Sequence, residues 1–276
     1  MARLIVGTEN NADIELYYED HGAGQPVVLV PGFPLDGRSW ERQERVLLEA
    51  GFRVITYDRR GFGRSGRPAI GFDYDTLAAD LRALLERLDL EDVVLVGFSM
   101  GTGEIARYLG TYGSSRVAKA VLIGSLPPFL LRTDENVQGV DGEVFDEIRT
   151  AITGDRYAYL EDLFNDLYNV DVLGGTRISD QAWQAAFILA ADASPLAMLG
   201  CVDSWRTDFR NDLRAIDVPV LAVHGTDDRI LPIQATAHRL GMVLDDLHLV
   251  TVEGGPHSIT WTHPDEVNAA LLEFLA

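Results

Sequence analysis

The chain has 276 residues, of which 43 are acidic and 23 basic, so its formal net charge is −20. With 47% hydrophobic and 24% charged residues, it has the composition of an ordinary globular protein with a buried core, which excludes disordered and collagen-like chains. No basic run occurs, so we expect no nucleic acid and no anionic membrane surface among its partners.

Eight apolar runs predict β-strands. Most of them contain β-branched residues and leucine without alternation, which is typical of strands buried on both faces. In chain order the runs are Leu4–Gly7, Ile14–Glu19, Pro26–Val30, Val54–Tyr57, Val93–Val96, Val117–Ile123, Val218–Val223 and Leu247–Val252.

Segments with helical periodicity lie between these strands. They are Trp40–Ala50, Tyr74–Leu88, Gly101–Tyr112, a short helix ending at His238–Gly241, and Pro264–Leu275. Strands that alternate with helices predict an α/β protein with a mostly parallel, eight-stranded sheet covered by helices on both faces.

The alternation stops between about Pro127 and Asp212. This part contains four helical stretches, Glu143–Ile152, Tyr157–Leu167, Asp180–Ala191 and Pro195–Trp205. We interpret residues 127–212 as a helical cap over the carboxyl ends of the strands, where ligands of open α/β sheets bind. Residues 1–126 and 213–276 then form the core.

The single cysteine, Cys201, excludes an internal disulfide framework and metal sites built from thiolates alone. It lies in an apolar stretch, Met198–Val202, so we interpret it as a packing residue. The apolar run at the start of the sequence is too short for a signal peptide, and no run of about 18 apolar residues predicts a membrane span. We therefore expect a cytoplasmic protein.

The sharpest motif is Gly-x-Ser-x-Gly at residues 97–101, after an apolar strand and before a helical segment. A nucleophile on such a tight strand-to-helix turn needs small residues two positions before and after it. In that context the motif predicts that Ser99 is an exposed, strained nucleophile.

A serine hydroxyl needs a general base, and six histidines are available. His257 follows the last core strand, and a loop after a parallel strand delivers its side chain to the same sheet edge as Ser99. We predict His257 as the base. His224 precedes Gly225 at a strand end, where we expect it to hold a turn by hydrogen bonding.

The base needs an acid that fixes its tautomer, and in chain order this acid should lie between Ser99 and His257, after another strand. The strand ending at Val223 is followed by Asp227 and Asp228. Spacing alone does not choose between these two carboxylates.

With nucleophile, acid and base in this order, the chain resembles the α/β-hydrolase superfamily, and more specifically its cofactor-free bacterial haloperoxidases, or perhydrolases, with the related esterases and γ-lactamases. In this family the acid lies four residues after the histidine of the His-Gly turn, which selects Asp228. The segments that carry the resemblance are Glu15–Asp20, Pro34–Trp40, Tyr57–Gly63, Gly97–Glu104, Phe164–Asn169, Asp208–Arg210 and Trp261–His263.

The sequence departs from the family pattern at two positions. Pro31 stands where the family usually has the histidine of a His-Gly pair, and Ser258 stands where it usually has a glycine. Pro31 removes an imidazole that often braces the loop, but it removes no member of the triad. The amide of Phe33 is still available beside that of Met100 for an oxyanion hole.

The resemblance implies acyl transfer: Ser99 attacks an ester carbonyl, His257 takes its proton, and the amides stabilise the oxyanion. It also implies a branch in which hydrogen peroxide replaces water, a short carboxylic acid becomes a peracid, and the peracid oxidises halide. That chemistry needs no haem, no metal and no other cofactor. Candidate walls of the acyl pocket are Phe33, Met100, Phe129, Trp205 and Ile230.

Three other functions are considered. A γ-lactamase or amidase would use the same triad. Epoxide hydrolases and dehalogenases normally have an aspartate where Ser99 stands. A non-catalytic ligand receptor on this fold would lack a triad member, and none is missing from the sequence. Relatives are often multimeric, so a homo-oligomer is an open expectation.

Overall fold

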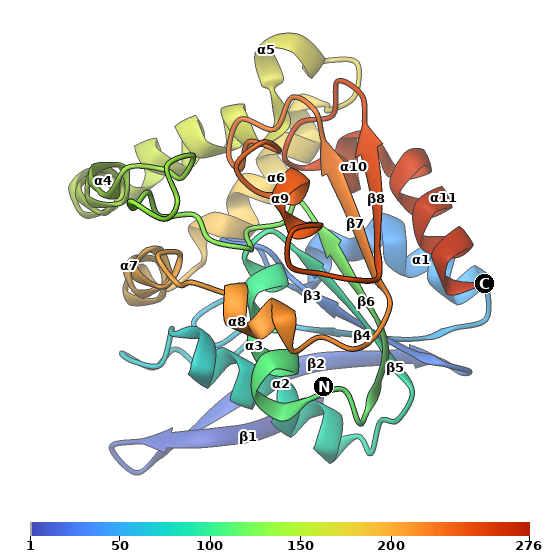
Figure 1. Cartoon of the computed structure of the whole chain (residues 1–276). Coiled ribbons are helices and arrows are strands. Elements are labelled where there is room, and N and C mark those ends of the chain that lie inside the picture. The colour runs from blue at the N-terminus through green and yellow to red at the C-terminus, as the bar shows by residue number, and fades with distance from the viewer. Residues whose placement is uncertain (1) are drawn as a thin grey trace.

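The computed structural model describes residues 2–276. Their eight strands form one mixed sheet (Figure 1). Residue 1, which belongs to the expected core range, lies outside the described residues. The strand order is β1-β2-β4-β3-β5-β6-β7-β8. The bounds are β1 Ala2–Glu9, β2 Ala12–Gly22, β3 Pro26–Val30, β4 Arg53–Tyr57, β5 Val93–Phe98, β6 Val117–Ile123, β7 Val220–Gly225 and β8 Leu247–Val252.

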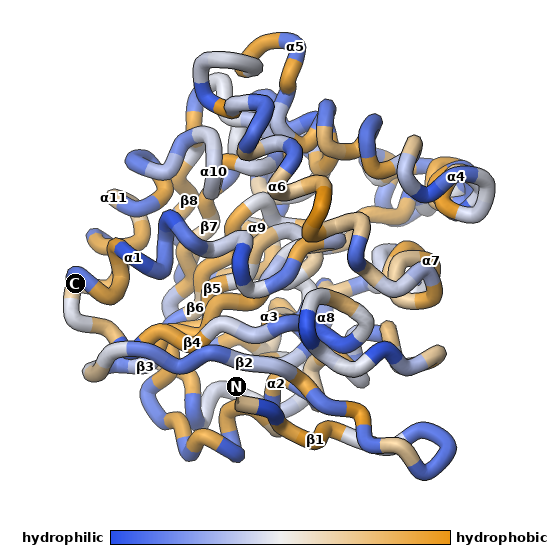
Figure 2. Tube along the Cα trace, turned by 180° about the vertical axis from the view of Figure 1, so that it is seen from behind, coloured by the Kyte–Doolittle hydropathy of each residue, from blue (hydrophilic) through white to orange (hydrophobic). Residues whose placement is uncertain are grey.

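The sheet is parallel except at one edge, where β1 pairs with β2 and β2 with β4 in antiparallel fashion. The central strands β3, β5 and β6 are almost completely buried, as their unbroken apolar runs predict. The hydrophobic colour of Figure 2 is concentrated along these strands. The predicted mostly parallel, eight-stranded sheet is confirmed.

Helices cover both faces of the sheet (Figure 1). The helices α1, α10 and α11 pack together, and α2, α3 and α8 form a second group. Asp73 begins α2, because its carboxylate accepts a hydrogen bond from the Thr76 amide at 2.9 Å. The bounds are η1 Gly37–Trp40, α1 Glu41–Glu49, α2 Tyr74–Arg87, α3 Met100–Tyr112, α8 Arg210–Arg214, α9 Ala237–Leu240, α10 Ile259–Thr262 and α11 Pro264–Leu275.

Between β6 and β7 the chain forms a helical layer at the carboxyl ends of the strands (Figure 1). It contains α4 Gly142–Tyr168, α5 Val170–Leu173, α6 Asp180–Ala191 and α7 Pro195–Ser204. Helix α4 is kinked at Asp155, whose backbone is not helical. This kink lies in the gap between the two helices predicted there.

The two ends of this layer are joined to each other close to the core. Phe129 and Asp208 form an isolated antiparallel bridge, and the Phe209 amide donates to the Pro128 carbonyl at 3.0 Å. The chain therefore leaves the core and returns to it through one narrow stem.

In residues 2–276 no single helix is long and apolar enough to cross a membrane; α6 and α7 meet the length and composition criteria as a pair, but they are bent by 92° to each other.

Candidate active site

Ser99 occupies the sharp turn between β5 and α3. Its φ of 53° and ψ of −120° are unfavourable for a residue with a side chain, and such strain is kept where the surrounding structure enforces it. A Cβ at Gly97 would lie 2.8 Å from the backbone of Gly101, and one at Gly101 would lie 2.5 Å from the Val30 carbonyl oxygen. Both glycines are therefore required for the close approach of strand, helix and loop that holds Ser99 in place.

Hydrogen bonds fix the same turn. The Ser99 amide donates to the Ile123 carbonyl at 2.8 Å, which ties the turn to β6. The Thr102 hydroxyl donates to the Ser99 carbonyl at 2.6 Å and accepts from the Leu126 amide at 3.0 Å. The Ser99 backbone is thus held on both sides of the residue.

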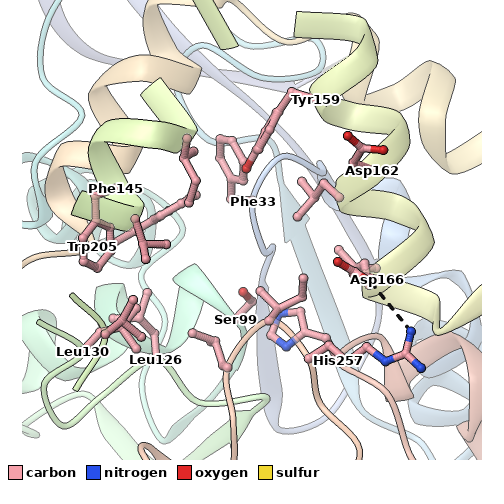
Figure 3. A pocket seen from close by; sticks show the side chains of 18 residues that line it. Phe33, Ser99, Leu126, Leu130, Phe145, Tyr159, Asp162, Asp166, Trp205 and His257 are labelled. Atoms are coloured by element: carbon pink, nitrogen blue, oxygen red, sulfur yellow. Dashed lines mark ion pairs between the residues drawn. The ribbon is translucent and has the colours of Figure 1, made fainter. Parts of the chain in front are cut away.

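His257 lies in the loop between β8 and α10, and its side chain is buried next to Asp228. Its Nδ1 lies 2.7 Å from Asp228 Oδ2. Because a carboxylate can only accept, Nδ1 carries the proton and Nε2 is left as an acceptor. The ring also packs on Phe98, with 5.0 Å between centroids. Ser99 and His257 lie next to each other at the floor of one cavity (Figure 3).

Asp228 has every acceptor position filled. Its Oδ1 accepts the amides of Ile230 and Leu231 at 2.9 and 2.7 Å, and its Oδ2 faces His257 and the Nε2 of His224, the latter at 3.1 Å. Burial raises the pKa of this carboxyl, but the two histidines outweigh it and hold the pKa well below its usual value. Asp228 is therefore ionised.

Asp227 is exposed, and its carboxylate makes no hydrogen bond to His257. Its amide donates to the Gly255 carbonyl at 3.0 Å, and its own carbonyl accepts from the Asn169 side chain at 2.9 Å. It holds the loop together, and Asp228 is the carboxylate that faces the imidazole.

His224 has a second contact that sequence reasoning missed. The Ser125 amide donates to its Nδ1 at 3.2 Å, so Nε2 carries the hydrogen and faces the Leu231 carbonyl at 2.8 Å and Asp228 Oδ2. The bond to Leu231 is the predicted turn contact. The contact with Asp228 could have been suspected from the four-residue spacing, but only the fold shows that both side chains point inward.

The backbone amides of Phe33 and Met100 are the predicted oxyanion donors. Phe33 lies in the loop after β3, and Met100 is the first residue of α3. Among the described residues neither amide has a hydrogen-bond acceptor. Met100 also contributes the positive end of the α3 dipole. Both amides are therefore available to an anionic oxygen.

The cavity above Ser99 measures 350 Å³ and is largely apolar (Figure 3). Three of the expected wall residues line it, namely Phe33, Trp205 and Ile230, and the Phe33 and Trp205 rings meet edge to face at 4.9 Å. Further apolar walls that the sequence did not single out are Leu126, Leu130, Val140, Val144, Phe145, Ile148, Tyr159, Leu163, Leu167 and Leu231.

Phe129 and Met100 were expected in the wall, and the structure corrects both. Phe129 belongs to the stem, where its backbone pairs with Asp208 and its ring lies 5.1 Å from the Arg210 guanidinium. The Met100 side chain is buried in the core. Apolar character predicts burial, but it does not say which side of the chain faces the cavity.

The rim of the cavity is charged. Asp162 and Asp166 on α4 are exposed there, and Arg229 lies 3.7 Å from Asp166 and 2.9 Å from Asp171 (Figure 3). The acidic rim disfavours an anionic ligand, and the apolar interior disfavours a charged one of either sign.

Within the described residues, one group has the composition of a metal site, namely Glu19, His21 and Glu44, whose ligand atoms lie within 4.8 Å of one another. It joins β2 to α1, and His21 pairs with Val54 near the start of β4, so it lies away from the carboxyl-end site. Glu19 already forms an ion pair with Arg64, with 2.8 Å between Arg64 Nη1 and Glu19 Oε1.

Comparison with known proteins gives a consistent result. The family model described as alpha/beta hydrolase fold matches residues 25–264. A Synechocystis protein named "Putative non-heme chloroperoxidase" is 59% identical, with 100% of both chains covered. The bifunctional esterase/perhydrolase of Acinetobacter calcoaceticus is 33% identical, over 95% of this chain and 96% of that protein. The crystal structure of a bromoperoxidase from Bacillus anthracis is 42% identical, with a TM-score of 0.95 and 99% of both chains covered.

Proposed function

Because this chain belongs to the α/β-hydrolase fold family, and within it to the non-heme haloperoxidases, we propose that it is a serine hydrolase that transfers acyl groups to water or to hydrogen peroxide. The observation that carries the proposal is the bond between His257 Nδ1 and Asp228 Oδ2, beside Ser99 on its strained turn. In this proposal Ser99 is the nucleophile, His257 the base and Asp228 the acid.

The first half of the reaction forms an acyl-enzyme. Ser99 Oγ bonds to the ester carbonyl carbon while His257 Nε2 takes its proton. The amides of Phe33 and Met100 stabilise the oxyanion, each by about 3–4 kcal/mol in the transition state. The C–O bond to the alcohol then breaks, and His257 returns the proton to the leaving alkoxide.

The second half passes the acyl group on. Water attacks the acyl-enzyme, His257 takes its proton, and a carboxylic acid leaves as the Ser99 hydroxyl is restored. When hydrogen peroxide attacks instead, the product is a peracid. The peracid transfers one oxygen atom and its proton to a halide ion in solution, giving hypohalous acid and the carboxylate, so halide needs no site on the protein.

We infer a small, uncharged ester as the substrate, or a short carboxylic acid in its protonated form in the perhydrolysis branch. The 350 Å³ apolar cavity supports an acyl group of modest size. The cytoplasmic location, the homo-oligomer and the division into core and cap remain predictions from the sequence.

A panel of p-nitrophenyl esters of increasing chain length, with and without peroxide and bromide, tests the proposal. We expect ester hydrolysis and peroxide-dependent bromination to be lost together in Ser99→Ala, by about a thousandfold or more, because both use one acyl-enzyme. Bromination that survives in Ser99→Ala would refute the peracid route.

Two further measurements separate the alternatives. A fluorophosphonate should form one adduct on Ser99, detected by mass spectrometry; absence of any adduct would favour a non-catalytic receptor. A bicyclic γ-lactam tested beside the esters distinguishes an amidase, which would turn over the lactam faster than any ester of the panel.

A further inference from the structure

The amides proposed for the oxyanion hole come from two separate pieces of chain, and their spacing must be fixed by something outside the triad. Phe33 belongs to the loop after β3, whereas Met100 begins α3. The loop and the helix pack in backbone contact, since a Cβ at Gly101 would lie 3.0 Å from the Pro31 carbonyl oxygen. Packing holds the two pieces together, but a directional bond is needed to fix how far one slides along the other.

One buried guanidinium supplies bonds to both pieces. Arg59 Nη2 donates to the Pro31 carbonyl at 2.7 Å, two residues before Phe33. Arg59 Nε donates to Glu104 Oε2 at 3.0 Å, and Glu104 lies one helical turn after Met100. Arg59 itself follows β4, so it reaches both pieces from a third element.

The partner of this guanidinium is also fixed. The Tyr57 hydroxyl donates to the other oxygen of Glu104. The side chains of Arg59 and Glu104 are each 1% exposed. The planar fork of an arginine makes two bonds in a set geometry, which a flexible ammonium does not.

Stability alone does not explain this arrangement. Arg59 Nη1 has no hydrogen-bond partner within residues 2–276, and a buried ion pair with an unsatisfied donor is a costly way to stabilise a fold. Well-packed apolar side chains at the two positions would serve stability equally well. The bond that they could not replace is the one to the Pro31 carbonyl.

We propose that Arg59 is a positioning residue, which through Pro31 and Glu104 sets the spacing of the Phe33 and Met100 amides. This inference rests on the proposed function for its kinetic consequence. The bond uses the carbonyl of residue 31, so it is independent of the proline side chain and braces the loop at the position where the family's histidine is missing.

The next residue along the chain gives a matched control. Arg60 forms an equally buried pair with Asp80 on α2, with Nε and Nη2 each 2.6 Å from a carboxylate oxygen. This pair makes no bond to the oxyanion loop. The two variants to compare are therefore R59M/E104Q, in which the introduced amide oxygen still accepts from the Tyr57 hydroxyl, and R60M/D80N.

In R59M/E104Q we expect kcat for p-nitrophenyl esters to fall about 10- to 100-fold with KM within about twofold, because misplaced oxyanion donors act on the transition state and hardly on substrate binding. We expect kcat of R60M/D80N to stay within about twofold of the wild type. Equal losses of kcat in the two variants would overturn the proposal.

A second measurement does not depend on catalysis. Hydrogen exchange of the peptide spanning residues 32–37 should become about tenfold faster in R59M/E104Q and stay unchanged in R60M/D80N, because the loop has lost its anchor in the first variant alone. Unchanged exchange in R59M/E104Q would overturn the proposal, whether or not the wild type has esterase activity. A wild type without esterase activity would instead refute the proposed function.

R59K covers the case in which the double variant does not fold. It keeps the charge opposite Glu104 but has one nitrogen in place of the guanidinium's three, two of which make the bonds to Glu104 and Pro31. We expect faster exchange of the same peptide and a lower kcat, both intermediate between the wild type and the values above. Wild-type exchange and kcat in R59K would contradict the proposal.

Discussion

At the scale of single residues, the carboxylate of Asp228 is the most fully satisfied group in the site. Two backbone amides and two imidazoles surround it, so its position and its charge are both fixed. A carboxylate in this setting orients the imidazole and stabilises the imidazolium that forms during acylation.

Replacing Asp228 by asparagine should therefore be far more harmful than replacing Asp227. We expect kcat of Asp228→Asn to fall by about 10³- to 10⁴-fold, because the amide no longer holds His257 in the tautomer with hydrogen on Nδ1. The matched variant Asp227→Asn, at the exposed neighbour, should stay within about twofold of wild type. Steady-state kinetics on one ester decides, and the opposite ranking would move the acid to Asp227.

The lowered pKa of Asp228 also predicts how stability depends on pH. A carboxyl whose pKa is lower in the folded than in the unfolded chain stabilises the fold above its usual value of 3.8, and this contribution is lost as the pH falls below it. The difference in Tm between wild type and Asp228→Asn should thus narrow as the pH falls below about 4. A difference that grows below about pH 4 would contradict this assignment.

The pKa of the Cys201 thiol is shifted in the opposite direction, upward. Burial raises the pKa of its thiol to about 12, and the thiolate is the form that reacts with peroxide and alkylating reagents. We expect iodoacetamide and millimolar peroxide to leave Cys201 unmodified in the folded protein at pH 8, and iodoacetamide to label it fully in denaturant. Mass spectrometry of the peptide measures this, and rapid labelling of the native chain would count against a packing role.

At the scale of elements, the approach of α3 to the loop after β3 depends on Gly101. We expect Gly101→Ala to lower stability by about 3 kcal/mol and activity at least tenfold, because the added methyl group would lie 2.5 Å from the Val30 carbonyl oxygen. The control is Gly154→Ala on α4, where nothing lies within 4 Å of the new Cβ.

Since alanine is the better helix former, Gly154→Ala should raise stability by about 0.4–1 kcal/mol. Chemical denaturation of the two variants gives both values. A Gly101→Ala protein as stable and active as the wild type would contradict this prediction. It would show that α3 can move away from the loop after β3 without loss of stability or activity.

Most elements could be predicted because their signals are local. The runs Pro26–Val30 and Val117–Ile123 coincide with β3 and β6, since β-branched residues packed on both faces leave an unbroken apolar pattern. The run Leu247–Val252 coincides with the edge strand β8, in which only Val252 is buried. The helices α5, α8 and α10 were not predicted, because four or five residues are too few to show a period.

The site divides in the same way. Ser99, His257 and the two candidate aspartates follow strand ends, so their order in the chain could reveal them. The bond between Arg59 and Pro31 joins residues 28 positions apart, and nothing in a sequence marks a buried arginine that reaches a backbone carbonyl. The pocket wall was predicted in part, because hydrophobicity does not encode which apolar side chains face a cavity.

At the scale of the whole molecule, the net charge of −20 and the acidic rim create a field that repels anions. We expect kcat/KM for a monoanionic ester such as p-nitrophenyl glutarate to rise about threefold or more between 20 mM and 0.5 M NaCl, as the Debye length shrinks from about 20 Å to about 4 Å. The value for neutral p-nitrophenyl butyrate should change by less than about twofold over the same range.

Two single-charge variants divide this effect between rim and surface. Asp162→Asn removes a charge at the cavity rim, and Asp13→Asn removes one from the remote end of the β1–β2 hairpin. The rim variant alone should weaken the salt dependence for the anionic ester. Equal effects of both variants would assign the repulsion to total charge.

The narrow stem formed by Phe129 and Asp208 has a consequence for how such enzymes diversify. Because the helical layer leaves the core and returns to it at neighbouring points, it can be replaced by another of different length with two junctions and no change in the order of the strands. The groups proposed for bond breaking stay with the sheet, while α4 and Trp205 carry much of the wall that meets the acyl group. Selection can thus change which acyl groups the cavity accepts without changing the groups proposed for bond breaking.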